Sequence, residues 1–170
     1  MSMKIIGAIL IIAGCGGVGF SMAAAHRREE RALRQLIGAL DYMGCELQYH
    51  LTPLPQLCRA VATETGGSVG QVFLALASEL ETQISPDAAS CMDAAVSKYP
   101  KLPHRIRKNM TQLGVSLGRF DLVGQLRGIG SARQMCRRDL EELSKDREQR
   151  LRNYQTLGLC AGSALAILFL

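Results

Sequence analysis

The sequence predicts an all-α protein, a bundle of about six helices flanked by an N-terminal and a C-terminal transmembrane helix. Of its 170 residues, 48% are hydrophobic but only 5% are aromatic, a balance typical of aliphatic helices rather than a β-sandwich. Apolar residues in the middle recur at helical spacing. No charge occurs in residues 5–25 or 156–170. We therefore divide the chain into an N-terminal transmembrane helix (1–25), a soluble all-α domain (26–152) and a C-terminal transmembrane helix (153–170).

The first apolar stretch is long enough to cross a membrane. Residues 3–25 are interrupted only by Lys4, and a bilayer core of about 30 Å needs about 20 helical residues. A signal peptide, or a lipoprotein cleavage box ending at Cys15, is the alternative. Because the apolar character continues past Cys15 and leads directly into a charged helical run, the sequence favours an uncleaved anchor.

A glycine-rich run inside this stretch, "GCGGVG" at residues 14–19, matches the dinucleotide-binding pattern. That motif needs a strand before it and a second strand that ends in an acidic residue about 20 positions on. The candidate acid, Asp41, lies within a helical pattern, so we expect no bound cofactor. The small residues Ala13, Gly17 and Ser21 instead recur every fourth position, a spacing that lets membrane helices approach closely.

The last apolar stretch is shorter, since about 15 residues cover only about 22 Å. Including residues 151–155, with Tyr154 at the interface, brings it to spanning length; a buried helix that ends the soluble domain is the alternative. Gly158, Gly162 and Ala166 share the small-residue spacing and are candidates for contact with the first span or another subunit. They could equally reflect the ordinary glycine content of membrane helices.

The first helix is expected to continue from the membrane to about Tyr49. After it, "TPLP" at residues 52–55 predicts a new helix, with Thr52 as N-cap, Pro53 at the first helical position and Pro55 in the first turn. Prolines are tolerated there because the first backbone N–H groups have no acceptor within the helix. This second helix folds back on the first, and "TGGS" at residues 65–68 ends it.

Four further helices follow. The third has an apolar stripe from Val69 to Ile84. "SPD" at residues 85–87 predicts a cap, with proline at the first position of the fourth helix, which runs to about Lys98. "YPKLP" at residues 99–103 precedes the fifth.

The fifth helix has an apolar face made by Ile106, Met110, Leu113 and Leu117. Asp121 is expected to cap the sixth helix. From residue 122 to residue 152 nothing in the sequence breaks this helix, which leads into the terminal apolar stretch.

No catalytic constellation is apparent. His26, His50 and His104 lie near predicted helix ends without metal-binding spacing, and the six cysteines form no C-x-x-C pair. Residues 26–152 hold every acidic residue and all but one of the 20 Lys and Arg residues. The charged run near residues 137–152 lacks interleaved aromatic residues, which favours a solvated helix face over a nucleic-acid contact.

Basic residues gather beside both apolar stretches: Arg27, Arg28, Arg31 and Arg34 follow the first, and Lys145, Arg147, Arg150 and Arg152 precede the second. The positive-inside rule therefore predicts that the domain between them faces the cytoplasm and that both termini face the other side.

Two segments carry a family resemblance. "RQLIGALDYMGCELQYHLTPLPQ" (34–56) and "LGVSLGRFDLVGQ" (113–125), together with the apolar termini, resemble the stage III sporulation protein AB family of endospore-forming bacteria. The specific parts are a T-P-L-P turn and an L-G-x-x-D-x-x-x-Q pattern. Their motif residues are Thr52, Pro53, Pro55, Gly118, Asp121 and Gln125.

The resemblance implies a non-enzymatic membrane component of the channel, or feeding-tube complex, that joins mother cell and forespore. The family looks like a reduced relative of the type II secretion F platform protein. Implied partners are other proteins of the stage III sporulation A operon, including a secretion-type ATPase, and membrane lipid, but no nucleic acid. The implied location is the mother-cell membrane, that is, the bacterial inner membrane or outer forespore membrane. One alternative is a membrane scaffold or regulatory subunit unrelated to sporulation. Another is a small membrane enzyme, which only the glycine run supports.

Overall fold

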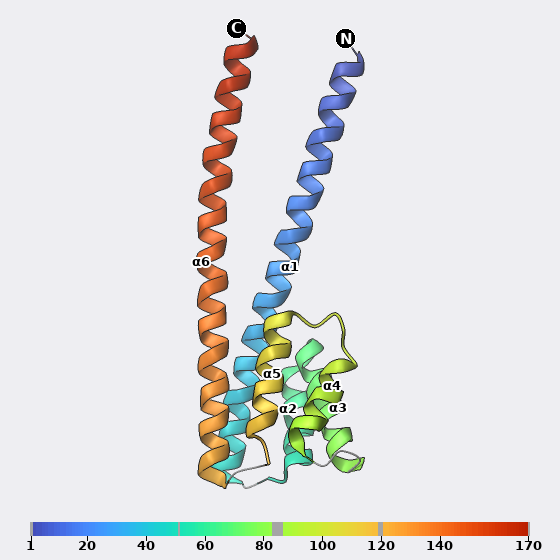
Figure 1. Ribbon diagram of the computed structural model, residues 1–170, viewed down its shortest axis with the longest axis vertical. Helices are drawn as coiled ribbons and strands as arrows, with labels where there is room; N and C mark the ends of the chain where they lie inside the picture. The colour runs from blue at the N-terminus through green and yellow to red at the C-terminus, as the bar shows by residue number, and fades with distance from the viewer. Residues whose placement is uncertain (1, 51, 83–86, 119–120, 170) are drawn as a thin grey trace.

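The computed structural model describes the backbone of residues 2–50, 52–82, 87–118 and 121–169, and the side chains of 24–50, 52–82, 87–118 and 121–145. These residues form six helices and no strand, which confirms the all-α prediction (Figure 1). The helices are α1 (Ser2–Tyr49), α2 (Leu54–Thr65), α3 (Gly67–Thr82), α4 (Ala88–Ser97), α5 (His104–Ser116) and α6 (Leu122–Phe169).

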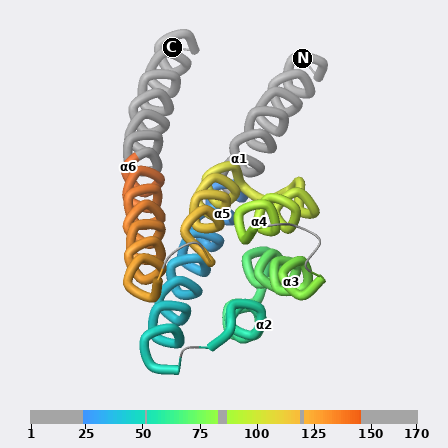
Figure 2. Tube along the Cα trace, turned by 60° about the horizontal axis from the view of Figure 1, so that its bottom comes forward, coloured from blue at the N-terminus to red at the C-terminus, as the bar shows by residue number. Residues whose placement is uncertain are grey.

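The two long helices α1 and α6 run side by side in opposite directions, so Ser2 and Phe169 lie at the same end of the molecule (Figure 1). Helix α1 is central, because it contacts α2, α3, α5 and α6. Helix α6 lies on the other side of α1 from α2 and α3 (Figure 2). The short helices pack against the C-terminal half of α1, where Ala32 is the first buried residue among the described side chains.

The core is aliphatic, with Phe73 of α3 as its largest fully buried side chain. Helix α1 contributes one stripe at three- and four-residue spacing, as its periodicity predicts. The stripe consists of Ala32, Leu33, Leu36, Ala39, Leu40, Met43 and Leu47. The predicted face of α5 is likewise buried, from Ile106 to Leu117. Burial of such side chains is worth about 1.5–3 kcal/mol each, so this stripe holds the short helices on α1.

The start of α2 differs from the sequence prediction. The N-cap is Pro53 and the first helical residue is Leu54, so the assignment of Thr52 as N-cap and Pro53 as first helical residue is wrong. The Thr52 hydroxyl donates instead to Oε2 of Glu46, 3.2 Å away on α1, a charged acceptor that competes with any capping role. Neither proline removes a hydrogen bond of the helix, because Pro53 is the N-cap and Pro55 is the second helical residue. The first backbone N–H groups of a helix have no acceptor within it.

The other helix boundaries follow local chemistry. Helix α2 ends at a glycine pair, Gly66 and Gly67, with φ of 62° and 58°, a left-handed backbone that suits glycine. Helix α4 begins at Ala88, and the Asp87 carboxylate accepts the Ser90 N–H at 2.7 Å. The predicted cap with proline at the first helical position is therefore wrong, because Asp87 takes the capping role one residue after the proline. Ile84, expected in the α3 stripe, lies outside the described residues.

Both predicted transmembrane stretches belong to the ends of α1 and α6 that lie furthest from the short helices (Figure 1). Their side chains lie almost entirely outside the described residues. Among the residues that were described, no helix combines the length and the apolar character needed to cross a membrane. The two spans therefore stay predictions.

Candidate functional site

A polar cluster joins three helices where α5 and α6 meet α1. The Arg105 guanidinium of α5 lies 2.8 Å from Glu142 and 3.5 Å from Asp139 on α6, and 3.8 Å from Glu29 on α1. The hydrogen bond to Glu142 raises the pKa of Arg105, an effect that partial burial opposes and the three nearby carboxylates support. One side chain thus ties α6 to both α1 and α5.

A buried amide lies beneath this cluster. Asn109 is only 1% exposed, and its Nδ2 donates to Asp139 at 2.8 Å and to the Cys136 sulfur at 3.3 Å. Burial raises the pKa of the Cys136 thiol to about 11, against a smaller lowering by the Asn109 hydrogen bond. A thiol protonated at neutral pH is a poor nucleophile, so this group of side chains is suited to holding helices together rather than to chemistry.

A second contact links the long helices further along their length. Arg133 of α6 donates to Asp41 of α1 at 2.6 Å, and both side chains are close to half exposed. Because Arg105 and Arg133 contact α1 near Glu29 and at Asp41, the two contacts together set the register between α1 and α6. Asp41, the acid considered for a nucleotide site, is thus an ion-pair partner on a helix.

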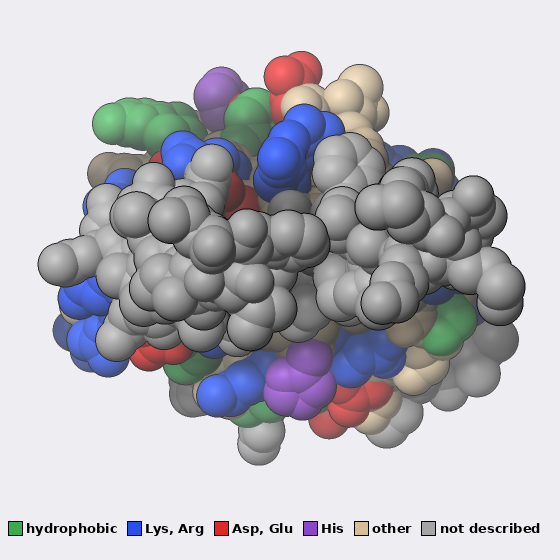
Figure 3. Space-filling model, turned by 90° about the horizontal axis from the view of Figure 1, so that it is seen from above, with side chains coloured by type: hydrophobic (Ala, Val, Ile, Leu, Met, Phe, Trp, Pro, Cys, Tyr) green, Lys and Arg blue, Asp and Glu red, His purple; other side chains and the backbone are tan. Residues whose placement is uncertain are grey.

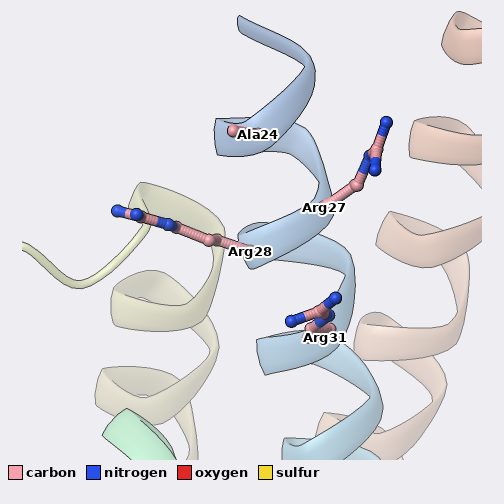
Figure 4. Close-up of a pocket in the computed structure, with 4 residues that line it drawn as sticks. All are labelled: Ala24, Arg27, Arg28 and Arg31. Carbon is pink, nitrogen blue, oxygen red and sulfur yellow. The ribbon is translucent and has the colours of Figure 1, made fainter. Parts of the chain in front are cut away.

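A pocket of about 160 Å³ lies where the described side chains of α1 begin. It is lined by Ala24, Arg27, Arg28 and Arg31 (Figure 4). Arg27 and Arg28 extend to opposite sides of the helix, and Arg31 lies one turn further along (Figure 4). All three arginines are exposed. The lining of this pocket thus contains three arginines and no acidic residue.

The sequence motif L-G-x-x-D-x-x-x-Q forms the turn between α5 and α6. Gly118 has φ of 74°, a conformation that glycine adopts without strain. The Asp121 carboxylate accepts the Gly124 N–H at 3.0 Å, which confirms the predicted cap of α6. The Gln125 backbone N–H donates to the Asp121 carbonyl at 2.9 Å and closes the first helical turn. The motif residues therefore shape a turn, and the T-P-L-P residues shape another.

The remaining predicted site residues are the small ones in the apolar stretches: Ala13, Gly17, Ser21, Gly158, Gly162 and Ala166. Their side chains lie outside the described residues. Within the described ranges, no three His, Cys, Asp or Glu side chains are grouped so as to hold a metal ion. His50 lies 3.5 Å from Glu46, and His104 is the first residue of α5.

Sequence reasoning missed the Arg105 cluster and Asn109. One signal was available for Asn109, because it lies three residues after Ile106 on the apolar face of α5, where a polar residue needs a buried partner. For Arg105 there was none, since its acidic partners are 34 and 37 residues away on α6.

The model of the stage III sporulation protein AB family matches residues 4–170. The chain belongs to this family. Stage III sporulation protein AB of Bacillus subtilis (strain 168) is 26% identical over 177 residues, and the match covers 99% of each chain. A solved structure of a stage III sporulation protein AB superposes with a TM-score of 0.64 at 22% identity, covering 72% of this chain and 98% of that one. The resemblance predicted from the sequence is confirmed, and the family points to a role in sporulation.

Proposed function

We propose that the chain is a non-enzymatic, platform-like membrane component of the channel complex between mother cell and forespore, resembling the type II secretion F protein. The observation that carries this proposal is the antiparallel arrangement of α1 and α6 (Figure 1). It brings the apolar stretches at residues 5–25 and 156–170 to one end, away from the short helices. Two spans joined through a helical domain on one side suit a protein that presents this domain to partners.

The lengths of the two helices support the same placement. Each has 48 residues, and at 1.5 Å per residue this is about 72 Å, more than twice the bilayer core of about 30 Å. Among the described side chains of α1, the first buried one is Ala32, seven residues after the apolar stretch ends.

The charge pattern supports an orientation. Arg27, Arg28, Arg31 and Arg34 follow the first stretch, and a second basic group from Lys145 to Arg152 precedes the other. By the positive-inside rule, the helical domain faces the mother-cell cytoplasm, and both termini face the space between the two membranes.

The energy for transport would come from a partner. The chain has no G-x-x-x-x-G-K-[ST] motif with which to bind a nucleotide, so a secretion-type ATPase encoded in the stage III sporulation A operon is the proposed source. Contacts with other operon proteins would include the membrane face made by Gly158, Gly162 and Ala166, because small residues let helices pack closely in lipid.

Co-purification from sporulating cells tests this proposal. The tagged full chain, extracted in mild detergent, should bring down other operon proteins and the ATPase. The variant Gly158→Ile with Gly162→Ile should reduce this recovery without changing the unfolding temperature of the helical domain. Recovery of none of these proteins, or expression confined to vegetative growth, would contradict the proposal and favour a scaffold unrelated to sporulation.

A further inference from the structure

Three arginines near the point where the described side chains of α1 begin have no partner among those side chains, although acidic residues lie beside them. Glu29 pairs with Arg105, and Glu30 pairs with Arg34 at 2.9 Å. No hydrogen bond or ion pair joins Arg27, Arg28 or Arg31 to any other residue whose side chain the structure describes. The acids of this segment are thus engaged elsewhere, and no described side chain neutralises the positive charge of the three arginines.

The spacing of these arginines places like charges together. Arg31 lies four residues after Arg27 and three after Arg28, so it is the helical neighbour of both, and like charges at this spacing destabilise a helix. All three line the same pocket of about 160 Å³, which exceeds several times the roughly 30 Å³ that one water molecule occupies. An anion bound there would relieve the repulsion. A guanidinium group matches the geometry of a phosphate with two parallel hydrogen bonds.

The position along the helix indicates which anion. Ala24 and Ala25 end the charge-free stretch, and Arg31 follows Ala25 by six residues, a rise of about 9 Å. The polar headgroup region of a bilayer occupies about 5–8 Å on each side of the hydrocarbon core. With residues 5–25 across the membrane, the backbones of Arg27 and Arg28, about 3 and 4.5 Å beyond Ala25, lie within this region, and that of Arg31 lies at its outer edge.

The described rim of the bundle at the end that would face this membrane carries charges of both signs. Seen from the end at which α1 begins, Lys and Arg side chains are visible at several places on the rim, and Asp and Glu side chains at others (Figure 3). The arginines of the pocket, rather than this rim, would favour lipids with net negative charge over zwitterionic ones.

We propose that the pocket lined by Ala24, Arg27, Arg28 and Arg31 binds the phosphate of an anionic phospholipid headgroup. This inference rests on the membrane placement in the proposed function. It adds a specific lipid site to what would otherwise be a non-specific basic flank.

Native mass spectrometry of the full chain in neutral detergent tests the site. The protein is equilibrated with equal concentrations of dioctanoyl phosphatidylglycerol and dioctanoyl phosphatidylcholine, and separately with inorganic phosphate. The parent protein should retain phosphatidylglycerol preferentially. The triple variant Arg27→Gln, Arg28→Gln, Arg31→Gln should lose this binding by about tenfold or more.

A matched control removes the same charge elsewhere. Arg127, Arg137 and Arg138 are exposed residues of α6, and their triple replacement by Gln should leave phosphatidylglycerol binding within about twofold of the parent, because charge far from the headgroups contributes little. The variant Arg27→Lys, Arg28→Lys, Arg31→Lys keeps the positive charge but loses the guanidinium groups, which can each give a phosphate two parallel hydrogen bonds. It should therefore bind with intermediate strength. Circular dichroism establishes that each variant is folded. If the Gln triple fails to fold, the Lys variant alone decides the site.

Three outcomes would overturn the inference: equal retention of both lipids by the parent, equal losses in the two Gln triples, or inorganic phosphate retained as strongly as phosphatidylglycerol, which would indicate a free-anion site. Carbonate extraction of membranes separates this failure from failure of the proposed function. If carbonate releases the parent protein, the membrane placement is wrong. If the parent stays in the membrane but shows no lipid preference, only the headgroup site is wrong.

Discussion

Two glycines of α6, two residues apart, should respond to alanine in opposite ways. A Cβ built on Gly128 would overlap the Cβ of Ser116 on α5 and lie 2.7 Å from its Oγ, whereas a Cβ on Gly130 meets nothing within 4 Å. Both positions are helical, so alanine gains about 1 kcal/mol of helix propensity at each. Only at Gly128 does it also force two packed helices apart.

The magnitude follows from these two contributions. Overpacking in a well-packed site costs about 1–3 kcal/mol. Gly130→Ala should therefore stabilise the domain by about 1 kcal/mol, and Gly128→Ala should lie below it by the whole overpacking cost. The assay is denaturant unfolding of the full chain in detergent, followed by circular dichroism.

The variant Ser116→Gly provides a control, because it removes the Cβ that the new methyl group overlaps. In that background, Gly128→Ala should recover most of the stabilisation that Gly130→Ala shows. Equal stabilisation by Gly128→Ala and Gly130→Ala in the parent background would refute the close packing of α5 on α6.

Further predictions concern single contacts. Thr52→Ala should destabilise the parent by about 1 kcal/mol but have almost no effect in a Glu46→Ala background, since the hydroxyl bonds the carboxylate; an equal cost in both backgrounds would restore Thr52 as a cap. The Arg59 hydrogen bond lowers the pKa of Glu81 below 4.5. This stabilisation is present above the pKa of the unfolded state and lost as pH falls through the lower folded value, so acid should destabilise the parent more than Glu81→Gln. Maleimide at pH 7.5 should modify exposed Cys45 faster than Cys136, which is buried and whose pKa is raised to about 11; equal rates, read by peptide mass spectrometry, would contradict the packing of α5 on α6.

The helical architecture could be predicted because apolar spacing is a local signal. The stripe through Leu33, Leu36 and Leu40 is buried as its period requires. The Asp121 cap was equally local. Before α4, Ser85 and Asp87 flank Pro86, and both are residue types that can cap a helix. Local preference alone does not decide which of the two is the N-cap.

Contacts between distant residues could not be predicted in this way. Thr52 is a good capping residue by type, yet the Glu46 carboxylate of another helix takes its hydroxyl. Arg105 finds its partners only once α5, α6 and α1 are packed together. The partnerless arginines of the α1 pocket became recognisable only because the structure assigns partners to Glu29 and Glu30.

We propose that α1 and α6 anchor the chain in a membrane, with the helical domain on the cytoplasmic side. Cys45 is an exposed cysteine of that domain, and labelling it with a membrane-impermeant maleimide in intact protoplasts tests this claim directly. We expect Cys45 to be protected until the cells are lysed, and a cysteine introduced by Ser2→Cys to be labelled in intact protoplasts. Labelling of Cys45 before lysis would contradict the account.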